Sequence, residues 1–278
     1  MNRREALARA KLFAIFFGLV LSFFIIRIIV SPADPIGFAL LAGSSAAFLF
    51  LALFSRRNER LSKYWQVFFV FFIVSIVPLS WGILPVVIAE QFGLAPDAAV
   101  LNFLLLNWLL IVAPIIILTK VSGGDMGSIF LKRGNLKLGL ILGIIGFVVA
   151  FVLAVPLANS FYAGENITFI GVLPLMPLIF VAIFANASLE EVSFRGVILK
   201  KLEPHLGRTA SNIFQAIIFM LAHLLVGYAR FPLVFIAFTF FIGLLFGYLM
   251  TKTDSIIAPI LVHAGGDVAI FMVLLTNG

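Results

Sequence analysis

The chain alternates between apolar segments long enough to cross a lipid bilayer and short polar loops. A membrane-spanning helix needs about 20 predominantly apolar residues. Nine windows of this kind are present, at residues 11–30, 36–54, 64–89, 99–119, 137–158, 172–199, 210–229, 232–251 and 256–275. Pro174 and Pro177 in the sixth window and Pro259 in the ninth can shorten or kink these helices. We therefore predict an all-α polytopic membrane protein with eight or nine transmembrane helices.

The composition agrees with this class and excludes several others. Hydrophobic residues make up 63% of the chain and charged residues 11%, against roughly 25% charged residues in a soluble domain. The chain has no cysteine, which excludes disulfides, thiolate nucleophiles and cysteine-ligated metals. The net charge of +7 comes from basic residues in the loops. The positive-inside rule accounts for this distribution, so we expect no nucleic-acid partner.

Loop charge also predicts the orientation. Basic loops alternate with loops that contain acidic residues; the basic residues are Arg56, Arg57, Arg60, Lys63, Lys120, Lys132, Arg133, Lys137, Lys200, Lys201, Arg208 and Lys252. Arg230 is the one basic exception on the other side. Together with the basic N-terminus, this pattern predicts a cytoplasmic N-terminus, and an outer C-terminus if all nine segments cross the membrane.

Apart from Arg27, which is close enough to an outer helix end to reach the membrane surface, the ionisable residues well inside the apolar windows lie in the last part of the chain. Each costs roughly 2.5 to 3.5 kcal/mol near a helix centre, so such residues usually belong to a functional site. The residues are Glu190, Glu191, Arg195, His223, His263 and Asp267. At about 1.5 Å per residue, Glu190, His223 and His263 lie about 12 to 21 Å from the cytoplasmic helix ends. We predict that they share a site cavity among the last four helices.

Four pairs of residues in this part of the chain have the i, i+4 spacing that places side chains on one helix face. Glu191 and Arg195 predict an ion pair, while Glu190 is turned about 100° away and can face another helix. Asn186 lies one turn before Glu190 and can donate a hydrogen bond to it. The other two pairs are Phe219 with His223 and His263 with Asp267. In the last pair a carboxyl group can orient an imidazole, as in metal sites and acid–base sites.

Three motifs in this region resemble those of a known family. They are Glu190-Glu191-x-x-Phe194-Arg195-Gly196, Phe219-x-x-x-His223 and His263-x-x-x-Asp267. They are similar, in this order, to the signature motifs of the CAAX protease and bacteriocin-processing (CPBP, or Abi) family of intramembrane proteases, relatives of the Rce1-type prenyl-protein endoprotease. The resemblance covers roughly residues 170–275. We therefore divide the chain into N-terminal transmembrane helices without a motif, residues 1–165, and a catalytic helical core, residues 166–278.

The resemblance implies a glutamate-based peptidase that needs no cofactor or metal. Glu190 and His223 would activate a water molecule, and His263 and the residue at position 267 would stabilise the tetrahedral oxyanion. The residues expected to support the site are Glu191, Arg195, Phe219 and Asn186. The prenyl proteases carry asparagine where this chain has Asp267, and an ionised Asp267 would repel an oxyanion. This residue would have to be protonated, or would act by holding His263.

The implied substrate is a membrane-associated peptide or protein, and recognition of a prenyl group stays open. The expected location is a prokaryotic cytoplasmic membrane. Three alternatives remain. Glu190, His223 and His263 are suitable zinc ligands, so a zinc-dependent protease could use the same residues. Buried carboxylates and histidines also relay protons in proton-coupled transporters. Finally, the same fold could serve as an inactive scaffold or immunity protein.

Overall fold

A computed structural model describes residues 3–29, 35–82, 96–121, 123–224 and 226–276. These residues form helices, turns and loops without a β-strand, and the one β-bridge that is recorded among them joins Tyr162 to Ala229. The prediction of an all-α chain is confirmed.

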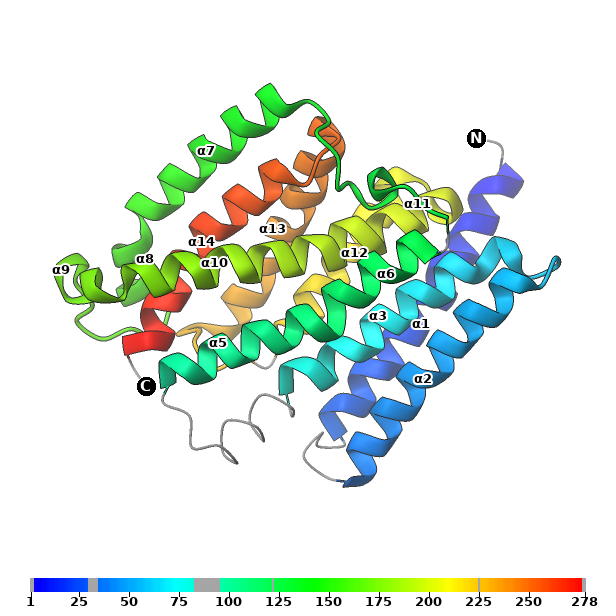
Figure 1. Ribbon diagram of the computed structural model, residues 1–278, viewed down its shortest axis with the longest axis horizontal. Helices are drawn as coiled ribbons and strands as arrows, with labels where there is room; N and C mark the ends of the chain where they lie inside the picture. Colours follow the sequence, from blue (N-terminus) through cyan, green and yellow to red (C-terminus); the bar gives the residue numbers. More distant parts are fainter. Residues whose placement is uncertain (1–2, 30–34, 83–95, 122, 225, 277–278) are drawn as a thin grey trace.

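The front part of the chain forms a group of mostly long helices (Figure 1). They are α1 (Arg3–Ile29), α2 (Pro35–Arg57), η1 (Ser62–Tyr64), α3 (Trp65–Gly82), α5 (Pro96–Asn107), the π-helix η2 (Trp108–Val112), α6 (Ala113–Val121), η3 (Met126–Ile129), α7 (Leu136–Val152) and α8 (Ala154–Ser160). The back part continues with α9 (Phe169–Val172), η4 (Leu173–Leu175), α10 (Met176–Glu190), the π-helix η5 (Glu191–Leu199), α11 (Lys200–Leu206), α12 (Arg208–Ala222), α13 (Pro232–Thr253) and α14 (Ile257–Thr276).

The chain is an integral, multi-pass membrane protein. Among the described residues, six helical segments are long and apolar enough to cross a membrane, or seven if α7 and α8, which are bent by 52°, form one span. The segment Ser62–Ile76 is a shorter apolar helix, and α12 has 15 residues. Part of the third predicted window, residues 83–89, lies outside the described residues. The count of eight or nine spans is therefore not confirmed and stays a prediction.

Helices of the front part of the chain pack against helices of the back part. In Figure 1, α7 lies alongside α14, and α10 packs against both α14 and α5. The largest group of buried apolar residues includes side chains from α1, α3, η5 and α12. The front helices therefore hold the helices that carry the candidate site.

Glycines allow the close approach of α7 and α14. A Cβ atom added at Gly143 would lie 2.6 Å from the Leu261 side chain, and one added at Gly265 would lie 2.7 Å from Cα of Phe147. On α13, a Cβ atom added at Gly243 would lie 3.1 Å from Cα of Ala216, and one added at Gly247 would overlap the Asn212 side chain, both on α12. These close contacts are typical of small residues at membrane helix interfaces.

Two adjacent glycines on α14 provide a test of this packing. We expect Gly265→Ala to lower the free energy of unfolding by about 1 to 3 kcal/mol, because the new methyl group overlaps the backbone of α7. Gly266→Ala is the matched control, because a Cβ atom there has no neighbour within 4 Å. The measurement is denaturant unfolding of both variants in detergent micelles. Equal stabilities of the two variants would contradict the described α7–α14 contact.

Candidate active site

The two adjacent glutamates lie at a change in helix type. The α-helix α10 ends at Glu190, and the π-helix η5 begins at Glu191. A π-helix pairs each N–H with the carbonyl five residues earlier, and such segments are frequent at functional sites. Both carboxyl groups are buried. The neighbouring side chains therefore enter the protein interior in different directions and have different partners.

Glu191 binds the side chains of Arg195 and His263 through one oxygen atom. Its Oε1 accepts a hydrogen bond from Nη1 of Arg195 at 2.8 Å, in an ion pair that is completely buried. The same Oε1 lies 2.8 Å from Nδ1 of His263, on α14. Because a carboxylate oxygen accepts, the His263 Nδ1 carries the hydrogen. The predicted Glu191–Arg195 pair is confirmed, and its extension to His263 fixes the orientation of the imidazole.

Aromatic rings and one carbonyl group surround the buried guanidinium. Its central carbon lies 4.2 Å from the ring centre of Phe219 and 5.1 Å from that of Phe246. Nη2 of Arg195 donates to the carbonyl of Gly243 at 3.4 Å. The Phe246 ring also stacks on His263, with 5.0 Å between ring centres. Cation–π contacts of this kind are strongest where water is excluded, so the aromatic rings hold both Arg195 and His263 in place.

Glu190 faces the two histidines. Its Oε2 lies 3.6 Å from Nε2 of His263 and 3.9 Å from Nε2 of His223. Its Oε1 accepts a hydrogen bond from Nδ2 of Asn186 at 3.3 Å, as predicted. Oε2 itself is buried and has no hydrogen-bond partner among the described residues. Burying a carboxylate oxygen without a hydrogen-bond partner raises the free energy of the folded protein unless a further group binds to that oxygen.

His223 follows the last residue of α12, and its orientation is set by its own helix. Its Nδ1 lies 2.8 Å from the carbonyl oxygen of Phe219. Since a carbonyl oxygen can only accept, Nδ1 carries the hydrogen, and Nε2 is the acceptor nitrogen of the neutral ring. The Phe219 and His223 pair predicted from their spacing is therefore joined through the Phe219 backbone. Nε2 is directed to the same region as the Glu190 carboxylate.

Asp267 is bound mainly to Asn186. Its Oδ2 accepts from Nδ2 of Asn186 at 3.1 Å, whereas its Oδ1 lies 3.5 Å from Nε2 of His263. The second distance exceeds that of a normal hydrogen bond. We expected Asp267 to orient His263 from the same helix face. The structure differs, because Glu191 on η5 is the closer partner of His263, by 0.7 Å (3.5 Å against 2.8 Å).

The structure brings together all the residues that the sequence singled out. They come from α10, η5, α12 with its C-terminal residue, and α14: Asn186, Glu190, Glu191, Arg195, Phe219, His223, His263 and Asp267. The sequence analysis missed the contribution of α13, whose Gly243 and Phe246 contact Arg195. Phe246 is one of 32 phenylalanines, and nothing in its local sequence sets it apart.

The described residues do not form an obvious metal site. Among them, no group of three or more His, Cys, Asp or Glu side chains has the proximity needed to hold a metal ion.

Comparison with known proteins gives a match to a family model. Residues 172–269 match the family model Rce1-like, described as type II CAAX prenyl endopeptidase Rce1-like. The matched range includes all eight residues that the structure brings together, from Asn186 to Asp267, which are here called the cluster. No curated protein and no solved structure matches the chain. The resemblance inferred from the three motifs is confirmed for this part of the chain.

Proposed function

Because residues 172–269 form an Rce1-like domain, we propose that the chain is a glutamate-dependent intramembrane endopeptidase. It hydrolyses a peptide bond in a membrane-associated or lipidated peptide or protein. The observation that supports this most strongly is the position of the buried Glu190 Oε2, 3.6 and 3.9 Å from the Nε2 atoms of His263 and His223. A water molecule can form hydrogen bonds to Oε2 and to either imidazole at these separations.

In the proposed reaction, Glu190 is the general base. It takes a proton from the water as the water oxygen attacks the scissile carbonyl carbon. The acceptor nitrogen of His223 holds and directs the same water. After the tetrahedral intermediate forms, protonated Glu190 returns the proton to the leaving amine nitrogen and the C–N bond breaks. One carboxyl group thus serves as base and then as acid.

His263 supplies positive charge and a donor for the developing oxyanion. Its Nδ1–H is bound to Glu191, so the imidazole cannot rotate away. Its Nε2 lies beside the carboxyl groups of Glu190 and Asp267, which favour a hydrogen on that nitrogen. Nε2–H is then a donor close to the attacked carbonyl. Asp267 acts by holding Asn186 and by its charge next to His263.

The proposed substrate reaches the site from the cytoplasmic leaflet of a prokaryotic cytoplasmic membrane. The basic loops at the ends of α2, α6 and α13 support a cytoplasmic position for this end of the bundle. The start of α1 and the end of α14 lie at opposite ends of the bundle (Figure 1). This arrangement agrees with an odd number of membrane crossings. We propose that no cofactor takes part.

The test is cleavage of a panel of membrane peptides, with and without prenylated CAAX ends, by purified protein. We expect His223→Gln to lower kcat about 10²-fold or more, the typical contribution of a positioned acid–base group. His205→Gln is the matched control, since His205 stacks on Tyr64, away from the cluster. Mass spectrometry of the products identifies the bond that is cut. Equal activity of His223→Gln and the control would contradict the proposed site.

A further inference from the structure

The candidate site has few neutral donors for a substrate carbonyl. The Asn186 amide already donates to Glu190 and to Asp267. Asp267 accepts that hydrogen bond, and a carboxylate acceptor repels an oxyanion. His263 is therefore the one donor of the motif residues that is directed to the reacting region. Oxyanion sites usually combine two donors, and the neighbouring loops offer a second one.

Two loops are joined next to the cluster. Tyr162 and Ala229 form an antiparallel bridge, and the N–H of Ala163 donates to the carbonyl of Tyr228 at 2.9 Å. The side chain of Arg230 strengthens this link, because Nε donates to the carbonyl of Tyr162 at 3.2 Å and Nη2 to that of Gly164 at 3.0 Å. The pair of loops, residues 161–168 and 226–231, is here called the loop clip.

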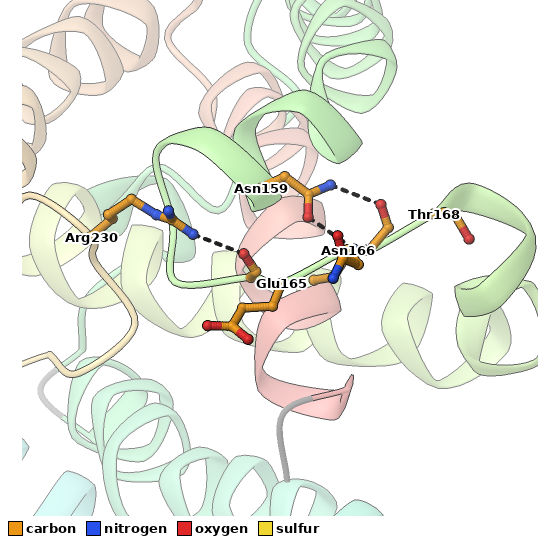
Figure 2. A pocket seen from close by; sticks show the side chains of 7 residues that line it. Asn159, Glu165, Asn166, Thr168 and Arg230 are labelled. Atoms are coloured by element: carbon orange, nitrogen blue, oxygen red, sulfur yellow. Dashed lines mark hydrogen bonds between the residues drawn. The ribbon is translucent and has the colours of Figure 1, made fainter.

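Figure 2 shows the outer side of the loop clip. Arg230 reaches across to the 161–168 loop, and Asn159 lies against the backbone of the same loop. Both the carbonyl and the N–H of Ile167 are bound by the Asn159 amide, at 2.8 and 2.9 Å. The open hollow between these residues has a volume of about 500 Å³. Its side chains bind the loops themselves, so Arg230, the exception in the charge pattern, has a structural role.

The inner side of the loop clip carries two tyrosines. The rings of Tyr162 and Tyr228 lie 6.1 Å apart, and both contact Phe235 on α13, at 6.0 and 5.6 Å. Phe235 in turn lies 6.1 Å from the ring of His223. The tyrosine rings are thus part of one aromatic layer that ends at a candidate catalytic histidine.

The phenol groups are within electrostatic range of the carboxyl groups of the cluster. Burial, together with the charges of Glu190 and Asp267, raises the pKa of Tyr228 well above its ordinary value. Burial, together with the carboxyl of Asp267, raises the pKa of Tyr162 above its ordinary value. Tyr228 therefore remains a neutral donor near both carboxyl groups, on a loop that is held in place by its backbone.

From the loop clip and the aromatic layer, we infer that the Tyr228 hydroxyl donates a hydrogen bond to the carbonyl oxygen of the scissile peptide. It is the second donor to the oxyanion, together with His263 Nε2–H. A phenol is suited to this position because it stays neutral and does not compete with the cluster for protons. The inference rests on the proposed function and assigns to Tyr228 a role that Asp267 cannot fill when it is ionised.

The test compares Tyr228→Phe with wild type on a peptide that wild type cleaves. We expect kcat to fall about 10²-fold, the typical cost of one lost oxyanion donor, while KM changes little. Tyr248→Phe is the matched control, since Tyr248 is exposed on α13. Thermal unfolding of both variants checks the fold. A second readout is the affinity for a peptide phosphonate, a mimic of the tetrahedral intermediate, which we expect to fall by a similar factor.

The outcomes separate this inference from the proposed function. If wild type cleaves the peptide and Tyr228→Phe retains the kcat and the phosphonate affinity of wild type, the role of Tyr228 is wrong and the peptidase stands. A rise in KM alone, with kcat unchanged, also overturns it, because the ring would then only shape the site. If wild type cleaves no peptide of the panel, the proposed function fails first and the inference fails with it.

Discussion

Replacing Glu190 with glutamine is expected to lower kcat for peptide cleavage about 10²- to 10⁴-fold, the contribution of a general base. The amide has the same shape, and its oxygen can still accept the hydrogen bond from Asn186 that Glu190 Oε1 accepts at 3.3 Å. It cannot take a proton from water at Oε2, next to the two histidines. The measurement is single-turnover cleavage together with thermal unfolding, in which we expect the melting temperature to be unchanged or slightly higher.

Glu165→Gln provides the matched control for this experiment. Glu165 is an exposed glutamate on the loop that follows α8, and the same chemical change there leaves the cluster intact. We expect this variant to cleave at the rate of wild type. If Glu190→Gln also cleaved at that rate, Glu190 would not be the base, and a scaffold or immunity role would become the better reading.

Loss of the buried guanidinium is expected to have the largest effect on stability. Arg195→Met leaves the Glu191 carboxylate buried without its ion-pair partner at 2.8 Å. Breaking a buried pair in this way typically costs about 3 to 5 kcal/mol. The ring contacts of Arg195 with Phe219 and Phe246 would be replaced only in part by the thioether. We expect denaturant unfolding in detergent micelles to show this loss directly.

A double variant separates the charge effect from the loss of packing. Glu191→Gln combined with Arg195→Met removes both charges, while the glutamine carbonyl can still accept from His263 Nδ1. Replacing a whole buried ion pair is often close to neutral in stability. We therefore expect the double variant to be more stable than Arg195→Met alone. If the two were equally unstable, the aromatic packing of Arg195 would be its main contribution.

Helical periodicity and apolar length were enough to predict the class of the protein and the position of its helices. Every predicted window overlaps a helix in the described residues, because a backbone in lipid must satisfy its hydrogen bonds within the segment. The first and last residues of the helices were less predictable. The sixth window begins at 172, but its α-helix begins at Met176, after Pro174 in η4. The window that ends at 229 corresponds to α12, which ends at Ala222.

Contacts within one helix were predictable from spacing, and contacts between helices were not. The Glu191–Arg195 and Asn186–Glu190 pairs follow from the i, i+4 rule. The hydrogen bond from His263 to Glu191 joins residues 72 positions apart, and it depends on how α14 packs against η5. The sequence therefore suggested Asp267 as the partner of His263, since it is the neighbour on the same helix.

The supporting residues carried no distinct sequence signal. Phe246 and Phe235 are two of many phenylalanines in apolar windows, where most positions face lipid or other helices. Tyr228 lies in a loop and belongs to none of the three motifs. The bridge between residues 162 and 229 holds it beside Tyr162 and Phe235, and contacts over such separations in sequence are visible only in the folded chain.

The most direct test of the central claim is cleavage of one identified peptide by wild type and Glu190→Gln, each with and without a strong zinc chelator. We predict that wild-type cleavage survives chelation and that Glu190→Gln cleaves at least about 10²-fold more slowly in both conditions. Loss of wild-type cleavage on chelation, with recovery on addition of zinc, would contradict the glutamate-activated water and would assign the same residues to a metal site.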